Sequence, residues 1–193
     1  MRLLLDAGGV LVTNGVMTAF FATLGLPQEA AWAEWQARYR APFWRGEIGI
    51  DETFDQMRSW ATSQGGRHVP YDPHQHMTLL PWAHDAAVLP CRKAVLSNHR
   101  HEWLLPALRP IASQFDAIFV SDMLRTRKPE PAAFTFALCA WGVHDPSEVI
   151  FVDDQAQNLD QARSMGMRVV KADPASRSWV DVVGAVIAAE VGV

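Results

Sequence analysis

The stretch "VIFVDDQAQNLDQARSMGM", residues 149–167, carries the clearest fold signal in the chain. Its first four residues are apolar without alternation and run directly into two carboxylates, Asp153 and Asp154. Continuous apolarity of this kind is typical of a strand buried on both faces of a parallel sheet. The residues that follow have helical spacing from about 156 to 165. The stretch therefore predicts a buried parallel strand that ends in an acidic pair and leads into a helix.

Four other short apolar runs share this character, and helical patterns lie between them. The runs are at 2–6, 93–97, 117–120 and 168–172, and the other helical patterns are at 100–113, 129–141 and 178–190. Strands that alternate with helices in this way form parallel sheets. We therefore predict an α/β fold with a Rossmann-like, five-stranded parallel sheet flanked by helices.

A long segment interrupts this rhythm between the first two strands. The segment 14–82 is longer than one crossover helix requires, and it contains amphipathic patterns at 27–39 and 51–61. We expect an inserted small helical cap over 14–82 and a core domain formed by 1–13 and 83–193. Five of the eight tryptophans fall in this region, and they either build the core of a small lobe or line a substrate pocket. They are Trp32, Trp35, Trp44, Trp60 and Trp82.

Composition narrows the classes of protein. The chain has 193 residues, of which 49% are hydrophobic and 20% charged, so it can bury a sizeable core. A formal charge of −4 gives no general reason to expect a nucleic-acid partner, and no apolar run approaches the roughly 20 residues that span a membrane. Cys91 and Cys139 lack metal-ligand spacing and do not resemble a disulfide framework. These features favour a cytoplasmic protein, and they leave its oligomeric state open.

Polar side chains follow three of the predicted strands. They are Asp6, then Ser97 with Asn98, and then the acidic pair, while Lys128 stands before a proline in "RKPEPAAF", residues 127–134. Each has an ordinary interpretation as a turn, a helix cap, a solvated pair or a surface lysine. The carboxyl ends of parallel strands meet where the strand order reverses. Together these residues therefore predict one site with a nucleophile, anion donors, a cation and metal ligands.

Four motifs resemble those of the haloacid dehalogenase-like (HAD) hydrolases, which are mostly phosphatases. The motifs are "LLLDAGGVL", "AVLSN", "RKPEPAAF" and residues 149–167, and "RGEIGIDETF" (45–54) is similar to a helical-cap segment. That cap subgroup includes sugar-phosphate phosphatases and the phosphatase domain of soluble epoxide hydrolases. The resemblance implies a Mg²⁺-dependent phosphomonoester hydrolase that acts on a small phosphorylated metabolite through an aspartyl-phosphate intermediate.

The resemblance also implies roles for the acidic residues. Asp6 would be the nucleophile that carries the phosphoryl group. Asp6, the backbone carbonyl of Gly8 and Asp154 would hold Mg²⁺, because this small hard cation takes oxygen ligands. Asp153 would orient water or Lys128 from behind these ligands.

The resemblance implies that residues of the second motif, "AVLSN", and the third, "RKPEPAAF", bind the phosphate. Ser97 would offer its hydroxyl and nearby N–H groups at the N-terminal end of a helix, and Asn98 would contact the phosphate or the leaving group. Lys128 would neutralise the equatorial oxygens and keep Asp6 ionised. His99 would reach the same crevice, although its ordinary interpretation is a polar residue on the first turn of a helix.

One position departs from the common family pattern. Gly8 stands where relatives usually have a second Asp that serves as general acid and base. Such catalysis is typically worth about 10²- to 10⁴-fold in rate. The resemblance therefore implies a slow enzyme unless another group, with His99 or Arg100 first, supplies the proton.

Two other classes of function stay open. A catalytically impaired HAD-fold binding or regulatory protein is the first, and Arg125, where relatives often have glycine, favours divergence in that loop. A dehalogenase is the second, although dehalogenases generally lack the acidic pair. The retained Asp6, Lys128 and Asp154 favour an active phosphatase.

Overall fold

The computed structural model describes residues 1–191 and contains a five-stranded sheet in which all neighbouring strands are parallel. The strand order is β3-β2-β1-β4-β5, so the direction of winding reverses between β1 and β4. The predicted fold class and its five strands are confirmed. The strands are β1 (Arg2–Leu5), β2 (Arg92–Ser97), β3 (Ala117–Val120), β4 (Val149–Asp153) and β5 (Arg168–Lys171).

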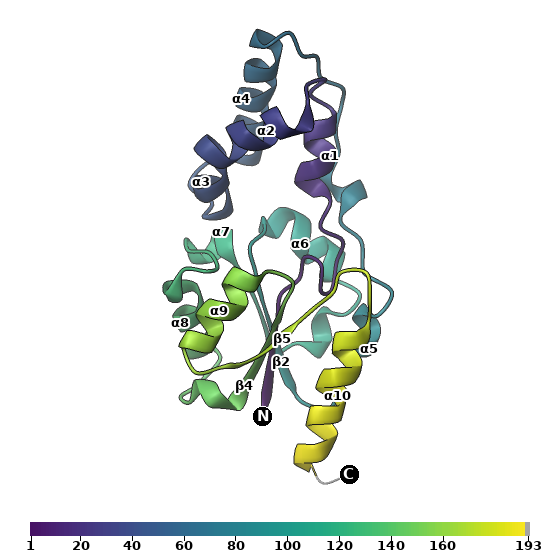
Figure 1. Cartoon of the computed structure of the whole chain (residues 1–193), viewed down its shortest axis with the longest axis vertical. Coiled ribbons are helices and arrows are strands. Elements are labelled where there is room, and N and C mark those ends of the chain that lie inside the picture. Colours follow the sequence, from purple (N-terminus) through teal and green to yellow (C-terminus); the bar gives the residue numbers. More distant parts are fainter. Residues whose placement is uncertain (192–193) are drawn as a thin grey trace.

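Helices cover both faces of the sheet (Figure 1). Residues of α5, α6 and α10 share one buried cluster with Leu3 and Leu5, whereas residues of α8 and α9 share the other with Leu4. Successive strand residues therefore face opposite layers, and this explains the continuous apolar runs. The helices of this lobe are α5 (Ala83–Ala87), α6 (His101–Leu108), α7 (Ser121–Leu124), α8 (Pro131–Ala140), α9 (Ala156–Ser164) and α10 (Ser178–Val191), with 3₁₀ turns at Ala112–Gln114 and Pro146–Glu148.

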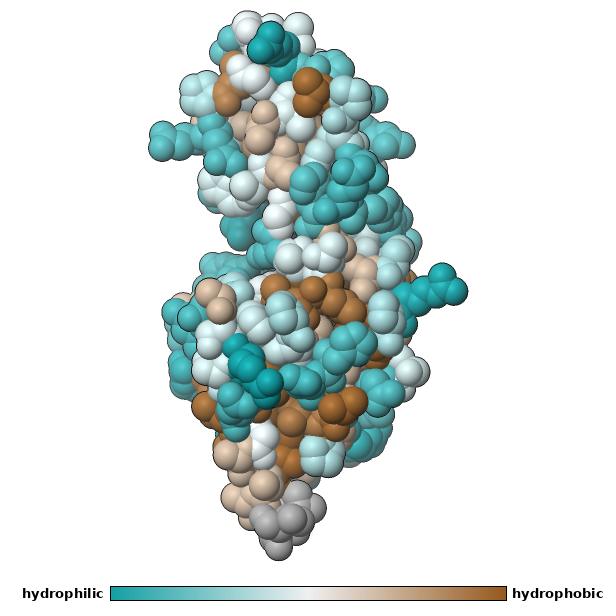
Figure 2. Space-filling model, turned by 90° about the vertical axis from the view of Figure 1, so that its right-hand side faces the viewer, coloured by the Kyte–Doolittle hydropathy of each residue, from teal (hydrophilic) through white to brown (hydrophobic). Residues whose placement is uncertain are grey.

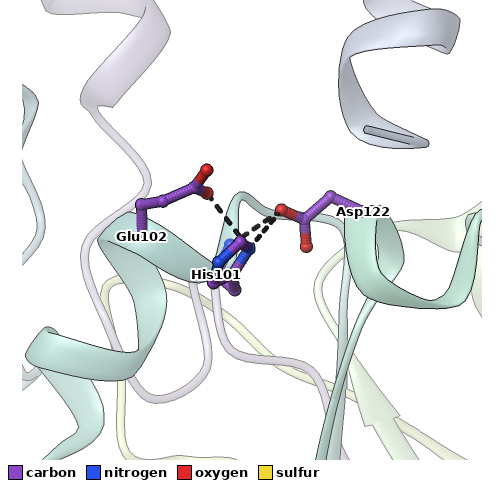
Figure 3. Close-up of side chains that lie close together, drawn as sticks. All are labelled: His101, Glu102 and Asp122. Atoms are coloured by element: carbon purple, nitrogen blue, oxygen red, sulfur yellow. Dashed lines mark hydrogen bonds and ion pairs between the residues drawn. The ribbon is translucent and has the colours of Figure 1, made fainter. Parts of the chain in front are cut away.

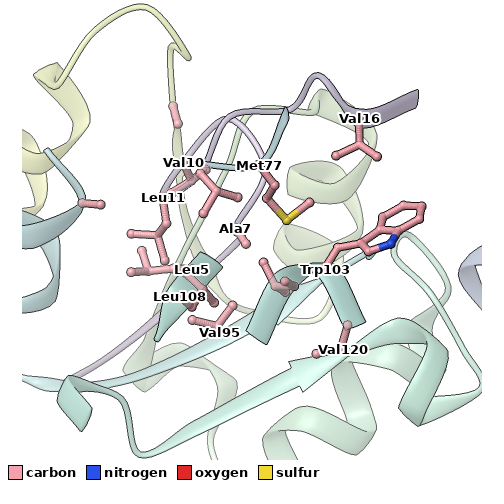
Figure 4. Close-up of a cluster of buried hydrophobic side chains, with 14 of the residues drawn as sticks. Leu5, Ala7, Val10, Leu11, Val16, Met77, Val95, Trp103, Leu108 and Val120 are labelled. Carbon is pink, nitrogen blue, oxygen red and sulfur yellow. The ribbon is translucent and has the colours of Figure 1, made fainter. Parts of the chain in front are cut away.

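The loop after β1 is anchored in the first cluster. Val10 and Leu11 are fully buried beside Leu5, Val95 and Leu108 (Figure 4). Burial of one such aliphatic side chain stabilises the fold by about 1.5–3 kcal/mol. The cluster therefore fixes the backbone that carries the residues directly after β1.

A separate helical lobe is inserted between β1 and β2, and it forms the upper part of Figure 1. Two of its helices match the amphipathic patterns, whereas α1 and α3 were not predicted, because α1 is short and apolar on most sides and α3 contains Pro42. The elements are α1 (Val16–Ala22), α2 (Gln28–Glu34), a π-helical turn (Trp35–Tyr39), α3 (Arg40–Trp44), α4 (Ile50–Ser63) and a 3₁₀ turn (Pro73–His76).

Aromatic rings build the core of the inserted lobe. Phe20 stacks on Phe54 with ring centroids 4.0 Å apart, and Phe54 lies 5.9 Å from Trp103 of α6. Trp35 is fully buried, whereas Trp32 is 41% exposed, so the aromatic residues of the amphipathic pattern at 27–39 are only partly internal. The aromatic core thus continues into the sheet lobe.

Arg100 is the main polar link between the two lobes. Its Nη1 donates hydrogen bonds to the backbone carbonyls of Phe43, at 3.2 Å, and Ile48, at 3.0 Å. Its Nε lies 3.3 Å from Asp122 Oδ2, and its Nη2 lies 3.2 Å from Glu102 Oε1. Arg100 therefore points toward the inserted lobe and does not replace the missing acid.

The turn after α3 also docks on the sheet lobe. Arg125 donates to the carbonyl of Gly46, and Arg45 Nη2 lies 2.5 Å from Glu130 Oε1. Gly46 has a φ of 66°, and a Cβ there would lie 2.7 Å from the carbonyl oxygen of Asp122. Only glycine fits this approach. Figure 2 shows that the two lobes meet at a narrow waist.

Several local predictions can be compared with these elements. The helix expected over 100–113 ends at Leu108, and His99 precedes it. Cys91 and Cys139 are both free thiols. Within residues 1–191, none of the helices combines the length and the apolarity needed to cross a membrane.

Candidate active site

Asp6 lies at the meeting point of three strand ends. Its backbone N–H donates to the carbonyl of Val152 at 2.9 Å, which continues the pairing of β1 with β4. Its Oδ1 accepts hydrogen bonds from Ala7 N at 2.6 Å and Ser97 Oγ at 2.9 Å, and it lies 2.9 Å from Lys128 Nζ. Among the described residues Oδ2 has no such partner, so this oxygen is left for an incoming group.

Lys128 is the buried cation of the site. Its side chain is fully buried, and Nζ lies 2.6 Å from Asp153 Oδ2 as well as 2.9 Å from Asp6 Oδ1. Burial alone would lower the pKa of Lys128, but the carboxylates of Asp153 and Asp6 outweigh it and raise the pKa above its ordinary value. Lys128 is therefore held as an ammonium ion against both carboxylates.

Asn98 fixes the position of Lys128. Its Oδ1 accepts from Lys128 N, and its Nδ2 donates to Lys128 O, both at 2.8 Å. The sequence predicts that Asn98 contacts the phosphate or the leaving group, and this stays a prediction: both ends of its amide bind this backbone, while the residue also lines the cavity over Asp6. Ser97 likewise ends β2, four residues before α6, and so does not stand at the helix N-terminus as expected.

Asp153 is fully satisfied by protein groups. Asn158 Nδ2 lies 3.0 Å from both of its carboxylate oxygens, and Gln155 N donates to Oδ1 at 2.8 Å. Lys128 takes Oδ2. Sequence reasoning missed Asn158, although its place five residues after Asp153, on the first turns of α9, was a usable signal. Asp153 therefore acts by holding Lys128.

Asp154 differs from Asp153 because its charge is not compensated. Its buried Oδ1 has no hydrogen-bond partner among residues 1–191. Burial, reinforced by the charges of Asp6 and Asp153, raises the pKa of Asp154 to about 7. Gly9, with a φ of 73°, closes this side, and a Cβ there would lie 2.8 Å from Asp154 Oδ2.

These observations fit a divalent cation. Ligand oxygens of Asp6, Asp153 and Asp154 lie within 4.8 Å of one another. Three carboxylates face one ammonium ion, so a charge of +2 would neutralise the site, and the free oxygen of Asp154 is an available ligand. A small hard ion such as Mg²⁺ prefers this donor set.

His99 and Asn14 fill the space beside Gly8. A Cβ on Gly8 would lie 2.8 Å from His99 Cε1 and 3.2 Å from Asn14 Cγ. His99 is buried, and burial together with the charge of Lys128 lowers its pKa to about 4, so the imidazole is neutral. Its Nδ1 lies 2.8 Å from Ser97 Oγ. The volume next to Gly8 is therefore taken by an imidazole.

A second acidic group lies outside this centre. Figure 3 shows the His101 ring between the carboxylates of Glu102 and Asp122, with Nδ1 3.2 Å from Glu102 Oε2 and 2.8 Å from Asp122 Oδ2. The guanidinium of Arg100 already pairs with both carboxylates. We therefore interpret this group as part of the contact between the lobes.

A cavity of about 360 Å³ opens over Asp6 between the two lobes. Three tryptophans line it, so the aromatic residues of the inserted lobe serve both as a core and as a pocket wall. The sheet lobe lines it with Asp6, Gly8, Asn98, His99, Arg127 and Gln155, and the insertion with Asn14, Val16, Met17, Thr18, Trp32, Trp35, Arg40 and Trp44.

Residues 91–172 match the family model described as "Haloacid dehalogenase-like hydrolase". Two curated relatives are similar over shorter segments: acyl-CoA dehydrogenase family member 10 of Mus musculus, 38% identical over 84 residues, and drimenol cyclase drtB of Aspergillus calidoustus, 40% over 74 residues. The matches cover 42% and 36% of this chain but only 8% and 14% of those longer proteins.

Solved structures resemble almost the whole chain. A HAD family enzyme of Bacteroides thetaiotaomicron superposes with a TM-score of 0.76 at 20% identity, covering 94% of this chain and 97% of that one. Its wild-type complex with magnesium and inorganic phosphate gives 0.68 at 19%, covering 88% and 92%. L-2-haloacid dehalogenase of Xanthobacter autotrophicus, with chloropropionic acid covalently bound, gives 0.64 at 20%, covering 88% and 76%.

The fold, the four motifs brought to one edge of the sheet, and the matching family model lead to the same assignment. The family model matched by residues 91–172 supports assignment to the haloacid dehalogenase-like hydrolase superfamily, and the solved structures show that almost the whole chain has the same fold.

Proposed function

We propose that this chain is a Mg²⁺-dependent phosphomonoester hydrolase that forms an aspartyl phosphate on Asp6. The observation that carries the proposal is the pairing around that carboxylate. Lys128 Nζ lies 2.9 Å from one of its oxygens, and the uncompensated Asp154 lies on the metal side. A nucleophile between a fixed cation and a divalent-ion site is what phosphoryl transfer requires, because negative charge accumulates on the transferred group.

The residues divide the reaction between them. Asp6 attacks phosphorus, the ester P–O bond breaks, and water then cleaves the acyl phosphate and restores the carboxylate. Lys128 neutralises phosphoryl oxygens, and Asp153 holds Lys128 in place. Asp6, the Gly8 carbonyl and Asp154 would hold Mg²⁺, which when bound neutralises further charge on the phosphoryl group.

Ser97 and His99 position the nucleophile. Ser97 Oγ donates to Asp6 Oδ1, so it accepts from Nδ1 of the neutral His99. This arrangement places no acid next to Gly8. We therefore expect aryl phosphates, whose alcohols depart without protonation, to be cleaved faster than alkyl phosphates.

We also propose that the two domains predicted from the sequence have separate roles. Residues 14–82 would serve as a lid, and 1–13 with 83–193 as the core, with a small phosphate ester bound in the cavity between them. A closed lid would exclude water and select the leaving group.

Phosphate release from p-nitrophenyl phosphate tests the proposal. We expect turnover with Mg²⁺, loss of turnover after chelation, and loss of at least about 10³-fold in Asp6→Asn, because an amide cannot replace the anionic nucleophile. The matched control is Asp160→Asn, an exposed carboxylate paired with Arg163, which should leave turnover unchanged.

Two results would favour the other classes. Chloride release from 2-chloropropionate without Mg²⁺ would indicate a dehalogenase. Thermal stabilisation by a phosphate ester without any turnover would indicate a binding protein. Retention of phosphatase activity within tenfold by Asp6→Asn would overturn the covalent mechanism.

A further inference from the structure

The cavity is lined by two arginines in addition to the buried cation Lys128 beside Asp6. Arg40, at the start of α3, and Arg127, directly before Lys128, both line it. Arg40 forms no ion pair or side-chain hydrogen bond with any described residue. The Nε of Arg127 is buried and has no hydrogen-bond partner in residues 1–191. Two guanidinium groups in one cavity are therefore left with donors to spare.

The neighbouring carboxylate does not satisfy them. Glu130 Oε1 lies 3.7 Å from Arg127 Nε, but it lies 2.5 Å from Arg45 Nη2. The other oxygen of Glu130 accepts from Thr126 Oγ1 at 3.0 Å. Burial lowers the pKa of Arg127, and the positive charge of Arg40 lowers it further, as expected for two like charges in one cavity. The arrangement is stabilised if an anion enters between them.

The reacting phosphate does not need this pair. Lys128 and the divalent-ion site already surround Asp6, while Arg40 belongs to the opposite lobe, beside Trp32, Trp35 and Trp44. Planar guanidinium groups bind carboxylate and phosphate oxygens in pairs of hydrogen bonds. The tryptophan rings that line the same cavity offer an apolar wall.

From this geometry we infer that the substrate carries a second anionic group, a carboxylate or a second phosphate, bound by Arg40 and Arg127 in the cavity between the lobes. The inference rests on the proposed phosphatase function and narrows its substrate class. Because Arg40 comes from the lid and Arg127 from the core, this second anion also holds the lid against the core.

Matched pairs of compounds test the inference. 3-Phosphoglycerate differs from glycerol 3-phosphate by a carboxylate, and fructose 1,6-bisphosphate differs from fructose 6-phosphate by a phosphate. We expect at least one two-anion compound to have a kcat/KM about tenfold or more above its partner. We expect Arg40→Gln and Arg127→Gln each to lower the kcat/KM of the two-anion compound about 10- to 100-fold, which corresponds to the usual free energy of a charged hydrogen bond.

The one-anion partners and a matched variant are the controls. Their kcat/KM should change less than about threefold in Arg40→Gln. Arg38→Gln removes the same charge from the same lobe, but Arg38 is exposed and paired with Glu34, so it should have no effect. Equal losses for both members of each pair would mean that the arginines contact the reacting phosphate, and this would overturn the inference.

Equilibrium binding separates this inference from the proposed function. Calorimetric titration of the turnover-deficient Asp6→Asn variant should show tighter binding of a two-anion compound than of its partner, and Arg40→Gln should remove the difference. No preference in this titration would reject the inference even if p-nitrophenyl phosphate is hydrolysed. A preference without any hydrolysis would keep the second-anion site and reject the phosphatase.

Discussion

The two walls of the cavity are built by different means. At the strand ends most polar atoms pair within the protein: Lys128 pairs with Asp6 and Asp153, and Asn158 contacts both oxygens of Asp153, so that within residues 1–191 one oxygen each of Asp6 and Asp154 is left open. On the lobe side Arg40 has no described partner and Trp32 is partly exposed. A side chain that is hydrogen-bonded or ion-paired to its neighbours keeps its position without a ligand. A side chain without such partners is available to bind a ligand. The wall formed by the strand ends, the strand-end wall, thus suits the chemical step. The wall formed by the inserted lobe, the lobe-side wall, suits substrate selection.

Removal of Lys128 should have the largest effect on the residues at the strand ends. Lys128→Met leaves buried carboxylates without their ammonium ion, and we expect a loss of about 3–5 kcal/mol in the free energy of unfolding together with loss of turnover. Urea denaturation without metal measures this. Lys171→Met, at an exposed lysine, should change stability by less than about 0.5 kcal/mol. A loss below 1 kcal/mol in Lys128→Met would show that the wall is not held by this ion.

The two residues of the acidic pair are expected to have different roles: Asp153 holds Lys128, and Asp154 binds the metal ion. Asp154→Asn should weaken Mg²⁺ affinity more than Asp153→Asn, because only Asp154 has a free oxygen. Without metal, Asp154→Asn should raise the unfolding temperature, since it removes an uncompensated buried charge, whereas Asp153→Asn should lower it. Thermal unfolding with and without Mg²⁺ measures both effects. The reverse order of Mg²⁺ affinities would exchange the two roles.

The space beside Gly8 tests whether His99 occupies the place of the usual family acid. Gly8→Asp should destabilise the protein by about 1–3 kcal/mol, because its Cβ would lie 2.8 Å from His99 Cε1. The double variant Gly8→Asp, His99→Ala should recover much of this loss, and only there do we expect faster cleavage of alkyl phosphates. Additive stability changes in the double-mutant cycle would show that the two positions do not compete for space.

The smallest expected effect concerns the docking of the lobe. Arg125 has a φ of 58°, a left-handed conformation that glycine adopts without strain. Arg125→Gly should therefore be more stable than Arg125→Ala by about 1 kcal/mol, because both variants lose the hydrogen bond to Gly46 and only alanine keeps the strain. Chemical denaturation of the pair measures the difference. Equal stabilities would mean that the strain is negligible.

The strand-end wall was predictable because each of its residues follows a recognisable apolar run. Asp6, Ser97 and Asp153 are placed by the ends of buried strands, and strand ends can be read from composition. The acid-lysine centre depends on the positions of backbone elements, so reading the strands was enough to bring these residues together. The structure adds contacts that the pattern does not indicate, as with Asn98, which binds the backbone of Lys128.

The lobe-side wall could not be predicted in the same way. Arg40 and Trp44 reach the cavity through a π-helical turn and a short helix that contains Pro42, and no periodic pattern indicates either. The position of His99 beside Gly8 also depends on a contact between two loops. Such contacts are set by tertiary packing, which spacing along one chain does not encode.

The covalent state of Asp6 during turnover shows directly whether Asp6 is the nucleophile. Protein mixed with p-nitrophenyl phosphate and Mg²⁺ is quenched in acid within milliseconds and analysed by mass spectrometry of its peptides. We expect one phosphoryl group on the peptide that contains Asp6, absent after chelation of Mg²⁺ and absent in Asp6→Asn. Phosphate release with no adduct at Asp6, or with the adduct on another residue, would contradict it.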